Sequence, residues 1–401
     1  MRGEFRQVFA VREFQGLWVG SLLSRGGDQL SRVALAVIAY QRTGSPALTA
    51  VVYALTLLPG LLGGPLLGWL ADRYPRREVM IACDVVRMVL MALVAVPGIP
   101  LWLLGGLVFA SQLLESPSRA SRIAMLPDVL PESVYATGVA VNHLTSQLLS
   151  LIGFAAGGVV VALTGPSTSL LIDSGTFALC ALVTLVLVRR RPAARRGSAS
   201  WLASTRGGFR LIAGSPPLRS LLGLALLAAF HVVPEAIAVP YASFLGLGTV
   251  EAGFMMAALP VGNVVGVYVM TRYAPVAMRL RWMGPMAVLG CAPLLAGPLH
   301  PGLFALLVLW TVTGVLTAYQ VSANAEFVRV VPNEQRGQAV GLASSALTAV
   351  QGLGVVVGGL LVQWTDPPTG LAIAGAAGLL VGLFAALAWR RAQTSTTPTP
   401  A

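Results

Sequence analysis

Two carboxylate side chains lie deep inside long apolar segments of this 401-residue chain, a position that demands an explanation. Asp28 lies near the middle of segment 15–41, and Glu235 lies near the middle of segment 219–246. If these segments cross a bilayer, each charge costs about 2.5–3.5 kcal/mol on insertion scales and needs a partner, a cavity or a function. A carboxylate that faces a cavity can take up a proton on one side of a membrane and release it on the other. Both acids are therefore candidates for proton coupling and for lining a substrate cavity.

Asp28 also has arginines near it along the helix, which offer it a structural ion pair instead. Arg25 and Arg32 lie three residues before it and four residues after it, on one helical face. Glu115 and Arg119 repeat this acid–base spacing in another apolar segment. They could pair with each other, or Arg119 could reach Asp28 across the cavity. The spacing leaves these alternatives open.

Glu235 has a histidine as its titratable neighbour. His231 precedes it by one helical turn, the spacing at which an imidazole can relay a proton to a carboxylate. A purely structural role for both residues is the alternative. Five further polar residues inside apolar segments are candidates for the same cavity: Asp173, Asn142, Tyr319, Gln320 and Asn324.

The densest local cluster of charge is GWLADRYPRREV, residues 68–79, between two apolar segments. Gly68 allows its helix to approach a neighbour closely. One acid and three guanidinium groups follow it: Asp72, Arg73, Arg76 and Arg77. Such a cluster can lock two helices together in one state and release them in another. We therefore expect a cytoplasmic gate, which Asp84 and Arg87 join, with simple anchoring of the loop at the inner membrane surface as the alternative.

The elements that must position these residues are membrane-spanning helices. The chain is 56% hydrophobic and 10% charged, whereas a soluble protein carries about 25% charged residues. Twelve apolar segments follow one another, each long enough to cross a bilayer as one helix. They are 15–41, 47–71, 78–97, 101–124, 136–163, 169–188, 219–246, 252–271, 282–299, 302–325, 337–363 and 369–389. The predicted fold class is all-α and integral to the membrane, with twelve transmembrane helices.

The basic charge is distributed as in a membrane protein. All 27 basic residues are arginine, and the formal net charge is +12. With the N-terminus inside the cell, the arginines between segments fall almost entirely in inner loops, and Arg42 is the exception. This bias predicts that both termini lie in the cytoplasm. The Arg-only, Ala- and Gly-rich composition favours a bacterial source, so we expect the chain in the plasma (inner) membrane of a bacterial cell. The arginine bias also explains the positive charge without nucleic acid as a partner.

The second half of the chain repeats the first at an offset of 201 residues. The matched pairs include Pro131 with Pro332, Gly153 with Gly354, Gly157 with Gly358, and Gly158 with Gly359. A duplication in register predicts two pseudo-symmetric six-helix bundles with a substrate path between them. We expect the bundles at 1–188 and 219–391, a cytoplasmic linker at 189–218 and a disordered tail at 392–401. The paired glycines predict close helix packing within each bundle.

Three stretches of the chain resemble a known family. The cluster at 68–79 resembles the loop signature of the major facilitator superfamily, with Pro75 where the family usually has Gly. The element GFAAGGVV, which begins at Gly153, is similar to one that marks proton-exchanging exporters, although Phe154 replaces the usual Pro. The opening FQGLWVGSLLSRGGDQLSRVALAVIAYQRTGSP resembles the branch that contains bacterial macrolide-efflux and enterobactin-export proteins. The resemblance implies the twelve-helix major facilitator fold.

These observations predict a secondary active transporter. The expected activity is proton-coupled efflux of an amphipathic small molecule, such as a drug, antibiotic or siderophore, by alternating access. A proton-coupled importer or a lipid flippase of the same fold is the alternative. The chain has no Gly-rich nucleotide-binding loop, so we expect a proton gradient to supply the energy and no cofactor to be needed. The three histidines have no metal-ligand neighbours, so we expect no metal site and no enzyme. The expected partners of the monomer are protons, the substrate and the lipid bilayer.

Overall fold

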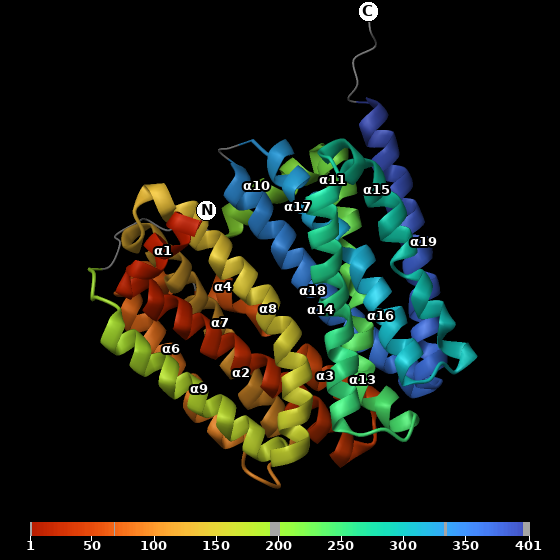
Figure 1. The fold of residues 1–401 in the computed structure, drawn as a ribbon, viewed down its shortest axis with the longest axis horizontal. Coiled ribbons are helices and arrows are strands. Elements are labelled where there is room, and N and C mark those ends of the chain that lie inside the picture. The colour runs from red at the N-terminus through yellow and green to blue at the C-terminus, as the bar shows by residue number, and fades with distance from the viewer. Residues whose placement is uncertain (1, 68, 193–200, 333–334, 396–401) are drawn as a thin grey trace, which may run out of the picture. The chain divides into compact units, whose positions relative to one another are not determined.

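The chain is helical throughout the part that the computed structural model describes, which comprises residues 2–67, 69–192, 201–332 and 335–395, and no strand occurs there (Figure 1). The helices form two compact units, here called unit 1 and unit 2. Unit 1 comprises Met1–Arg42 and Leu55–Ser198. Unit 2 comprises Thr43–Ala54 and Ala199–Ala401. The all-helical fold class is confirmed.

Unit 1 holds the helices of the first half of the chain. They are α1 (Arg2–Ala10), α2 (Arg12–Thr43), α4 (Pro59–Leu67), α5 (Trp69–Arg73), α6 (Arg76–Val94), α7 (Leu101–Val129), α8 (Glu132–Thr164) and α9 (Pro166–Leu187). Helix α6 packs against α7 and α9, and α4 packs against α7. Pro75, Pro100 and Pro131 directly precede α6, α7 and α8. Proline has a fixed backbone angle suited to a helix start and lacks only an amide hydrogen that the first turn leaves unbonded.

Unit 2 holds the second half together with one short helix from the first. Its helices are α3 (Pro46–Ala54), α10 (Trp201–Gly214), α11 (Pro216–Leu226), α12 (Ala228–His231), α13 (Val233–Phe244), α14 (Thr249–Tyr273), α15 (Val276–Leu289), the 3₁₀ helix η1 (Ala292–Leu299), α16 (Leu303–Thr317), α17 (Tyr319–Val330), α18 (Arg336–Trp364) and α19 (Pro367–Ser395). Helix α14 packs against α16, and α19 packs against both α15 and α18. Helix α10, which lies in the expected linker, packs on α18.

Each of the twelve predicted segments is occupied by one helix or by a run of consecutive helices. Within the described residues, nine spans are both long enough and apolar enough to cross a membrane. The three predicted segments that fall below this threshold are occupied by α2, α6 and α7. These are the helices that carry Asp28, Asp84 and Glu115 together with several arginines. The charge in these three helices therefore has to be accommodated inside unit 1.

The repeated glycines make equivalent contacts in the two units. A Cβ added at Gly153 of α8 would lie 2.7 Å from the Gln29 Cβ of α2. A Cβ added at Gly354 of α18 would overlap the backbone carbonyl of Ala229 in α12. One turn later, Gly157 faces Val33 and Gly358 faces Val233 in the same way. Gly158 is buried in α8. In each unit the glycines let the fifth segment of the repeat pack directly against the first.

The second predicted segment, 47–71, is divided between the units, which differs from the expected bundle boundaries. Residues 55–58 form a turn, after which α4 packs in unit 1. Helix α3 packs against α18 and α13 of unit 2. A Cβ at Gly359 would overlap the Ala50 side chain, so the absence of a side chain there makes room for α3. The Ser45 hydroxyl also hydrogen-bonds the Gln363 side chain at 2.7 Å.

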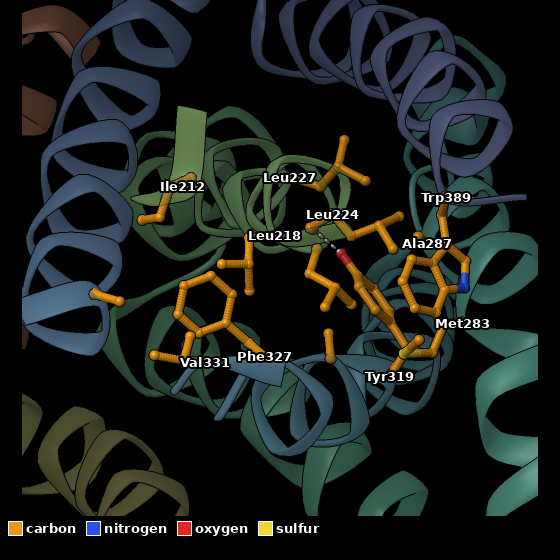
Figure 2. Close-up of a cluster of buried hydrophobic side chains, with 13 residues drawn as sticks. Ile212, Leu218, Leu224, Leu227, Met283, Ala287, Tyr319, Phe327, Val331 and Trp389 are labelled. Atoms are coloured by element: carbon orange, nitrogen blue, oxygen red, sulfur yellow. Dashed lines mark hydrogen bonds between the residues drawn. The ribbon is translucent and has the colours of Figure 1, made fainter. Parts of the chain in front are cut away.

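A hydrophobic cluster packs inside unit 2, and Figure 2 shows its side chains converging from several helices. Leu218 and Leu224 come from α11, Phe327 from α17 and Trp389 from α19. Ile212 of α10 belongs to the same cluster, so the expected linker helix is anchored to unit 2 by a buried side chain. Residues 193–200 of the expected linker lie outside the described residues, as do residues 396–401 of the tail.

Candidate functional site

A buried ion pair lies at the centre of unit 1. The Arg87 side chain of α6 is 1% exposed, and its Nη2 atom donates to Asp28 Oδ1 of α2 at 2.8 Å. Its Nη1 atom donates to the Ser24 hydroxyl at 3.3 Å. The guanidinium carbon lies 4.1 Å from the centre of the Phe177 ring of α9, a cation–π contact. Asp28 thus pairs with an arginine on another helix, and not with Arg25 or Arg32 on its own.

A second buried acid, Asp84, lies on α6 one turn before Arg87 and forms an ion pair of its own. Asp84 is fully buried, and its Oδ2 atom lies 3.8 Å from Arg122 Nη2 of α7. The Cys180 thiol donates to the same carboxylate at 3.0 Å. These pairings differ from the expected contact of Asp84 and Arg87 with the loop gate. Both point into the bundle, two or more turns from the arginines at the start of α6.

Asp173 of α9 is buried as well and is held by hydroxyl groups. Ser31 donates to one of its carboxylate oxygens, and Thr176 lies 3.3 Å from the other. A Cβ at Gly27 would collide with the Asp173 carboxylate, so the absence of a side chain there makes room for this acid. The acid expected in the cavity therefore serves as a polar contact between two helices, behind the Asp28–Arg87 pair.

Two adjoining pockets open beside the Asp28–Arg87 pair, both lined entirely by unit 1. The larger has a volume of about 420 Å³ and the smaller about 190 Å³. They share four lining residues: Arg25, Glu115, Arg119 and Ser146. Asn142 and Arg87 line the larger pocket, whereas Asp28 and Arg32 line the smaller. The structure therefore brings together five of the residues expected in the cavity: Asp28, Arg32, Glu115, Arg119 and Asn142.

Several of the lining arginines bind neutral partners. The Arg25 guanidinium donates to the Ser146 hydroxyl, and Arg32 donates to the Gln29 side chain at 3.0 Å. The Nε atoms of Arg32 and Arg87 are buried and have no hydrogen-bond partner among the described residues. A buried donor without a partner is costly, so these atoms mark positions where a bound acceptor would gain affinity.

The remaining expected cavity residues lie in unit 2 and do not line these two pockets. Glu235 of α13 accepts a hydrogen bond from the Tyr53 hydroxyl of α3 at 3.1 Å. His231 has its Nε2 atom 3.5 Å from the Cys291 sulfur, and its Nδ1 atom has no hydrogen-bond partner among the described residues. This pairing differs from the relay expected between His231 and Glu235.

Tyr319 is fully buried in the hydrophobic cluster of unit 2, where its hydroxyl donates to the Leu224 carbonyl at 2.7 Å (Figure 2). Its hydrogen-bonding capacity is therefore used inside the core and not on a cavity wall. Gln320 is half-buried and Asn324 is exposed on the same helix, α17.

The glycine contacts also test the expectation that Asp28 and Glu235 lie at matched depth. Gly153 packs on Gln29, and its repeat partner Gly354 packs on Ala229, so Gln29 and Ala229 are equivalent. Asp28 precedes Gln29 by one residue, whereas Glu235 follows Ala229 by six residues. At 1.5 Å per residue, the seven-residue difference is about 10 Å along a helix. The two acids do not occupy equivalent depths in the repeat.

The charged residues at the loop end of unit 1 pair with one another. Arg76 donates to Asp128 at 2.9 Å and to the Ala124 carbonyl at 2.7 Å, and Arg77 donates to the Leu185 carbonyl at 2.5 Å. Arg73 is exposed. Gly68 and the side chain of Asp72 lie outside the described residues. The arginines of the expected gate thus fasten the start of α6 to α7 and α9.

The segment that follows α9 folds back onto the same end. Arg190 pairs with Glu78 at 2.6 Å, and Arg191 pairs with Glu13 at 2.7 Å. Partial burial opposes the charge on Glu13, which precedes the first apolar segment. The hydrogen bonds from the Arg191 side chain and the Arg189 backbone outweigh that effect, so the pKa of Glu13 lies below its usual value.

Comparison with known proteins identifies the family. A sequence model of the Major Facilitator Superfamily matches residues 17–297 and 278–401, and the two ranges together cover nearly the whole chain.

The chain belongs to the major facilitator superfamily.

Named relatives of this superfamily member include two exporters. The enterobactin exporter EntS of Shigella boydii is 27% identical over 94% of this chain and 89% of EntS. The multidrug efflux pump Tap of Mycobacterium tuberculosis is 26% identical over 86% of this chain and 85% of Tap. A bacterial homologue of the human lysosomal transporter Spinster, in an inward-facing and occupied conformation, superposes with a TM-score of 0.77. The two chains are 15% identical, and the superposition covers 97% of this chain and 98% of the other. This likeness shows the fold. The predicted superfamily and its twelve-helix fold are confirmed.

Two arginines that form ion pairs at the site were not among the cavity residues expected from the sequence. Arg87 is the partner of Asp28, and Arg122 is the partner of Asp84. A signal for both existed, because each is an arginine inside an apolar segment that also carries an acid. The sequence could not show which acid each one meets, since that depends on the rotation of three helices about their axes.

Proposed function

We propose that this superfamily transporter exports an amphipathic small molecule in exchange for protons, by alternating access. The observation that carries the proposal is the pair of pockets in unit 1, where arginines and carboxylates line a space between helices that belong in a bilayer. Charged side chains at membrane depth are costly, and a substrate path is the usual reason for their presence. The relatives named as exporters support the outward direction.

Two carboxylates are candidates for the proton site, and their surroundings differ. Asp28 faces a guanidinium at 2.8 Å, whereas Glu235 faces a phenolic hydroxyl at 3.1 Å. A carboxylate that takes up a proton releases an ion-pair partner, so a proton on Asp28 would free Arg87. A proton on Glu235 would change its hydrogen bond with Tyr53. Either event can bias a transporter between two conformations.

The setting of the proposed transporter follows from its charge distribution. We place it as a monomer in the plasma membrane of a bacterium with both termini in the cytoplasm, since arginines are concentrated in the loops assigned to that side. The proton gradient supplies the energy, and no cofactor takes part. The paired arginines at the start of α6, together with Arg190 and Arg191, then lie at the cytoplasmic face, where we propose that they form part of the gate.

Reconstitution tests the proposal directly. The purified full-length chain is placed in liposomes with an acidic lumen, and uptake of two pH-insensitive xanthene dyes is followed: sulforhodamine B, an anion, and rhodamine 6G, a cation. Proton-driven exchange predicts accumulation of at least one dye that stops when an uncoupler collapses the gradient. Movement of dye and protons in the same direction would establish symport instead. Equal dye movement in protein-free liposomes would overturn the proposal.

A further inference from the structure

We infer that the pockets of unit 1 take an amphipathic anion, an organic molecule that joins a carboxylate, sulfonate or phosphate group to an apolar body. The inference rests on the proposed function, because it names the class of substrate for the same site. It is carried by the balance of charge around the pockets, by the way that charge is paired, and by the apolar surface beside it.

Positive charge exceeds negative charge on the pocket walls. Five arginines and two acids line the two pockets: Arg25, Arg32, Arg87, Arg119 and Arg122, with Asp28 and Glu115. Four of the arginines and only Glu115 among the acids line the larger pocket. Apolar side chains line the larger pocket beside the arginines, and low-dielectric walls strengthen the field inside a cleft of one sign.

The ion pairs do not remove this excess. Asp28 is matched by Arg87 at 2.8 Å, and Arg122 is matched by Asp84, which lies behind the pocket wall, at 3.8 Å. Arg25, Arg32 and Arg119 then share a single further carboxylate on the wall, that of Glu115.

The donors that remain suit an anion with several oxygens. Arg25 and Arg32 bind neutral oxygens of Ser146 and Gln29, and the Nε atom of Arg32 has no partner among the described residues. A guanidinium group presents paired N–H donors in a plane that fits the oxygens of a carboxylate, sulfonate or phosphate. A cation would meet repulsion from the same groups and offers them no acceptor.

The larger pocket also has an apolar side that fits the rest of such a molecule. Leu17, Ile123, Leu126, Val139 and Tyr135 line it together with the arginines. Its volume of about 420 Å³ lies within the range of sites that hold drug-sized ligands. A small inorganic anion would leave this surface unused, so we infer an organic anion with an apolar body.

Binding of a matched pair of dyes tests the inference on the full-length chain. The protein is placed in nanodiscs of zwitterionic lipid, so that the bilayer itself favours neither charge, and fluorescence anisotropy reports binding of sulforhodamine B and rhodamine 6G. We expect the anion to bind at least tenfold more tightly. Arg25→Gln and Arg119→Gln should each weaken its binding at least tenfold, whereas Glu115→Gln should strengthen it severalfold. The control Arg272→Gln removes the same charge from an exposed site on α14 and should change binding less than twofold.

Two results would overturn the inference. One is tighter binding of rhodamine 6G than of sulforhodamine B. The other is anion binding that survives both arginine substitutions in variants whose thermal unfolding matches the parent. The liposome experiment keeps the two proposals apart: gradient-driven export of the cation alone would support the proposed exporter and defeat the anion site. Absence of gradient-driven transport, with selective anion binding intact, would do the reverse.

Discussion

Unit 1 and unit 2 use the same glycine packing but hold charge in different ways. Gly153 and Gly354 bring equivalent helices together in each unit. Unit 1 adds to this framework a buried network of arginines and acids. In unit 2 the residue that matches the buried Asp173 in the repeat is the uncharged Ala374. The duplicated part is the framework, and the difference lies in the charge. We therefore expect the two units to have different tasks in one transport cycle.

The sign of charge suggests how those tasks divide. A proton on Glu115 would make the unit 1 pockets more positive, so a proton and an anion would favour each other's binding there. Exchange in opposite directions requires that the proton and the anion compete for the transporter. A proton bound outside the unit 1 pockets does not attract the anion into them, so competition is easier to achieve with a separate proton site. Glu235, bonded to Tyr53 in unit 2, meets that requirement. Export of an anion is also favoured by about 2.3 kcal/mol per 100 mV of inside-negative potential.

The largest expected effect contrasts the two acids. Asp28→Asn leaves the Arg87 charge buried without its partner and should lower the free energy of unfolding by about 3–5 kcal/mol. Glu235→Gln keeps an oxygen that accepts from Tyr53 and should cost about 1 kcal/mol at most. Thermal unfolding in detergent measures both. The double variant Asp28→Asn, Arg87→Met should recover most of the stability lost in Asp28→Asn. Equal losses for Asp28→Asn and Glu235→Gln would contradict the difference in charge pairing between unit 1 and unit 2.

The framework can be tested in both units by adding one methyl group. Gly354→Ala should cost about 1–3 kcal/mol, because the new Cβ overlaps the Ala229 carbonyl. Gly153→Ala should cost a similar amount, since its neighbour is the Cβ atom of Gln29 at 2.7 Å. Gly175→Ala is the control, because an added Cβ there has no neighbour within 4 Å. A large loss in one unit and none in the other would break the structural equivalence of the repeat.

A substitution in the Tyr53–Glu235 hydrogen bond can test the proposed proton coupling separately from substrate binding. Tyr53→Phe removes the hydrogen bond to Glu235 without changing the volume of the side chain greatly, and a hydrogen bond of this kind is worth about 0.5–1.5 kcal/mol. The substitution should slow gradient-driven dye exchange while dye binding to unit 1 stays within twofold of the parent. Tyr268→Phe, at a side chain that is 61% exposed, is the matched control. Loss of dye binding in Tyr53→Phe would contradict this separation.

The smallest expected effect concerns the loop end of unit 1. The pKa of Glu13 is lower in the folded chain than in an unfolded one, so its pairing with Arg191 stabilises the fold at neutral pH. That contribution is lost as the pH falls from the ordinary value near 4.5 through the lowered one. Glu13→Gln should therefore reduce stability by about 0.5 kcal/mol at pH 7, and the difference from the parent should shrink as the pH falls from 4.5 toward 3. A difference that persists undiminished at pH 3 would indicate a packing effect.

The sequence predicted the helices well because the signals for them are local. Segment lengths, prolines such as Pro131 and glycine pairs such as Gly153 with Gly354 fix helix starts and packing faces without knowledge of the fold. The partners of charged residues were harder to predict. Asp28 lies 59 residues from Arg87, and the choice among Arg25, Arg32 and Arg87 is made by how α2 and α6 face each other. The grouping of α3 with unit 2 likewise depends on space at Gly359, which a sequence does not display.

The three cysteines of this chain give it a practical property. Cys83, Cys180 and Cys291 are all free and buried, and two of them contact polar partners inside the units. Because all three native thiols are buried, a cysteine introduced at an exposed position such as Trp69 or Tyr273 should be the preferred target of thiol-reactive labels. The chain is thus suited to attaching spin labels or fluorophores without first removing its own cysteines, and distances between two such labels would report the conformational cycle directly.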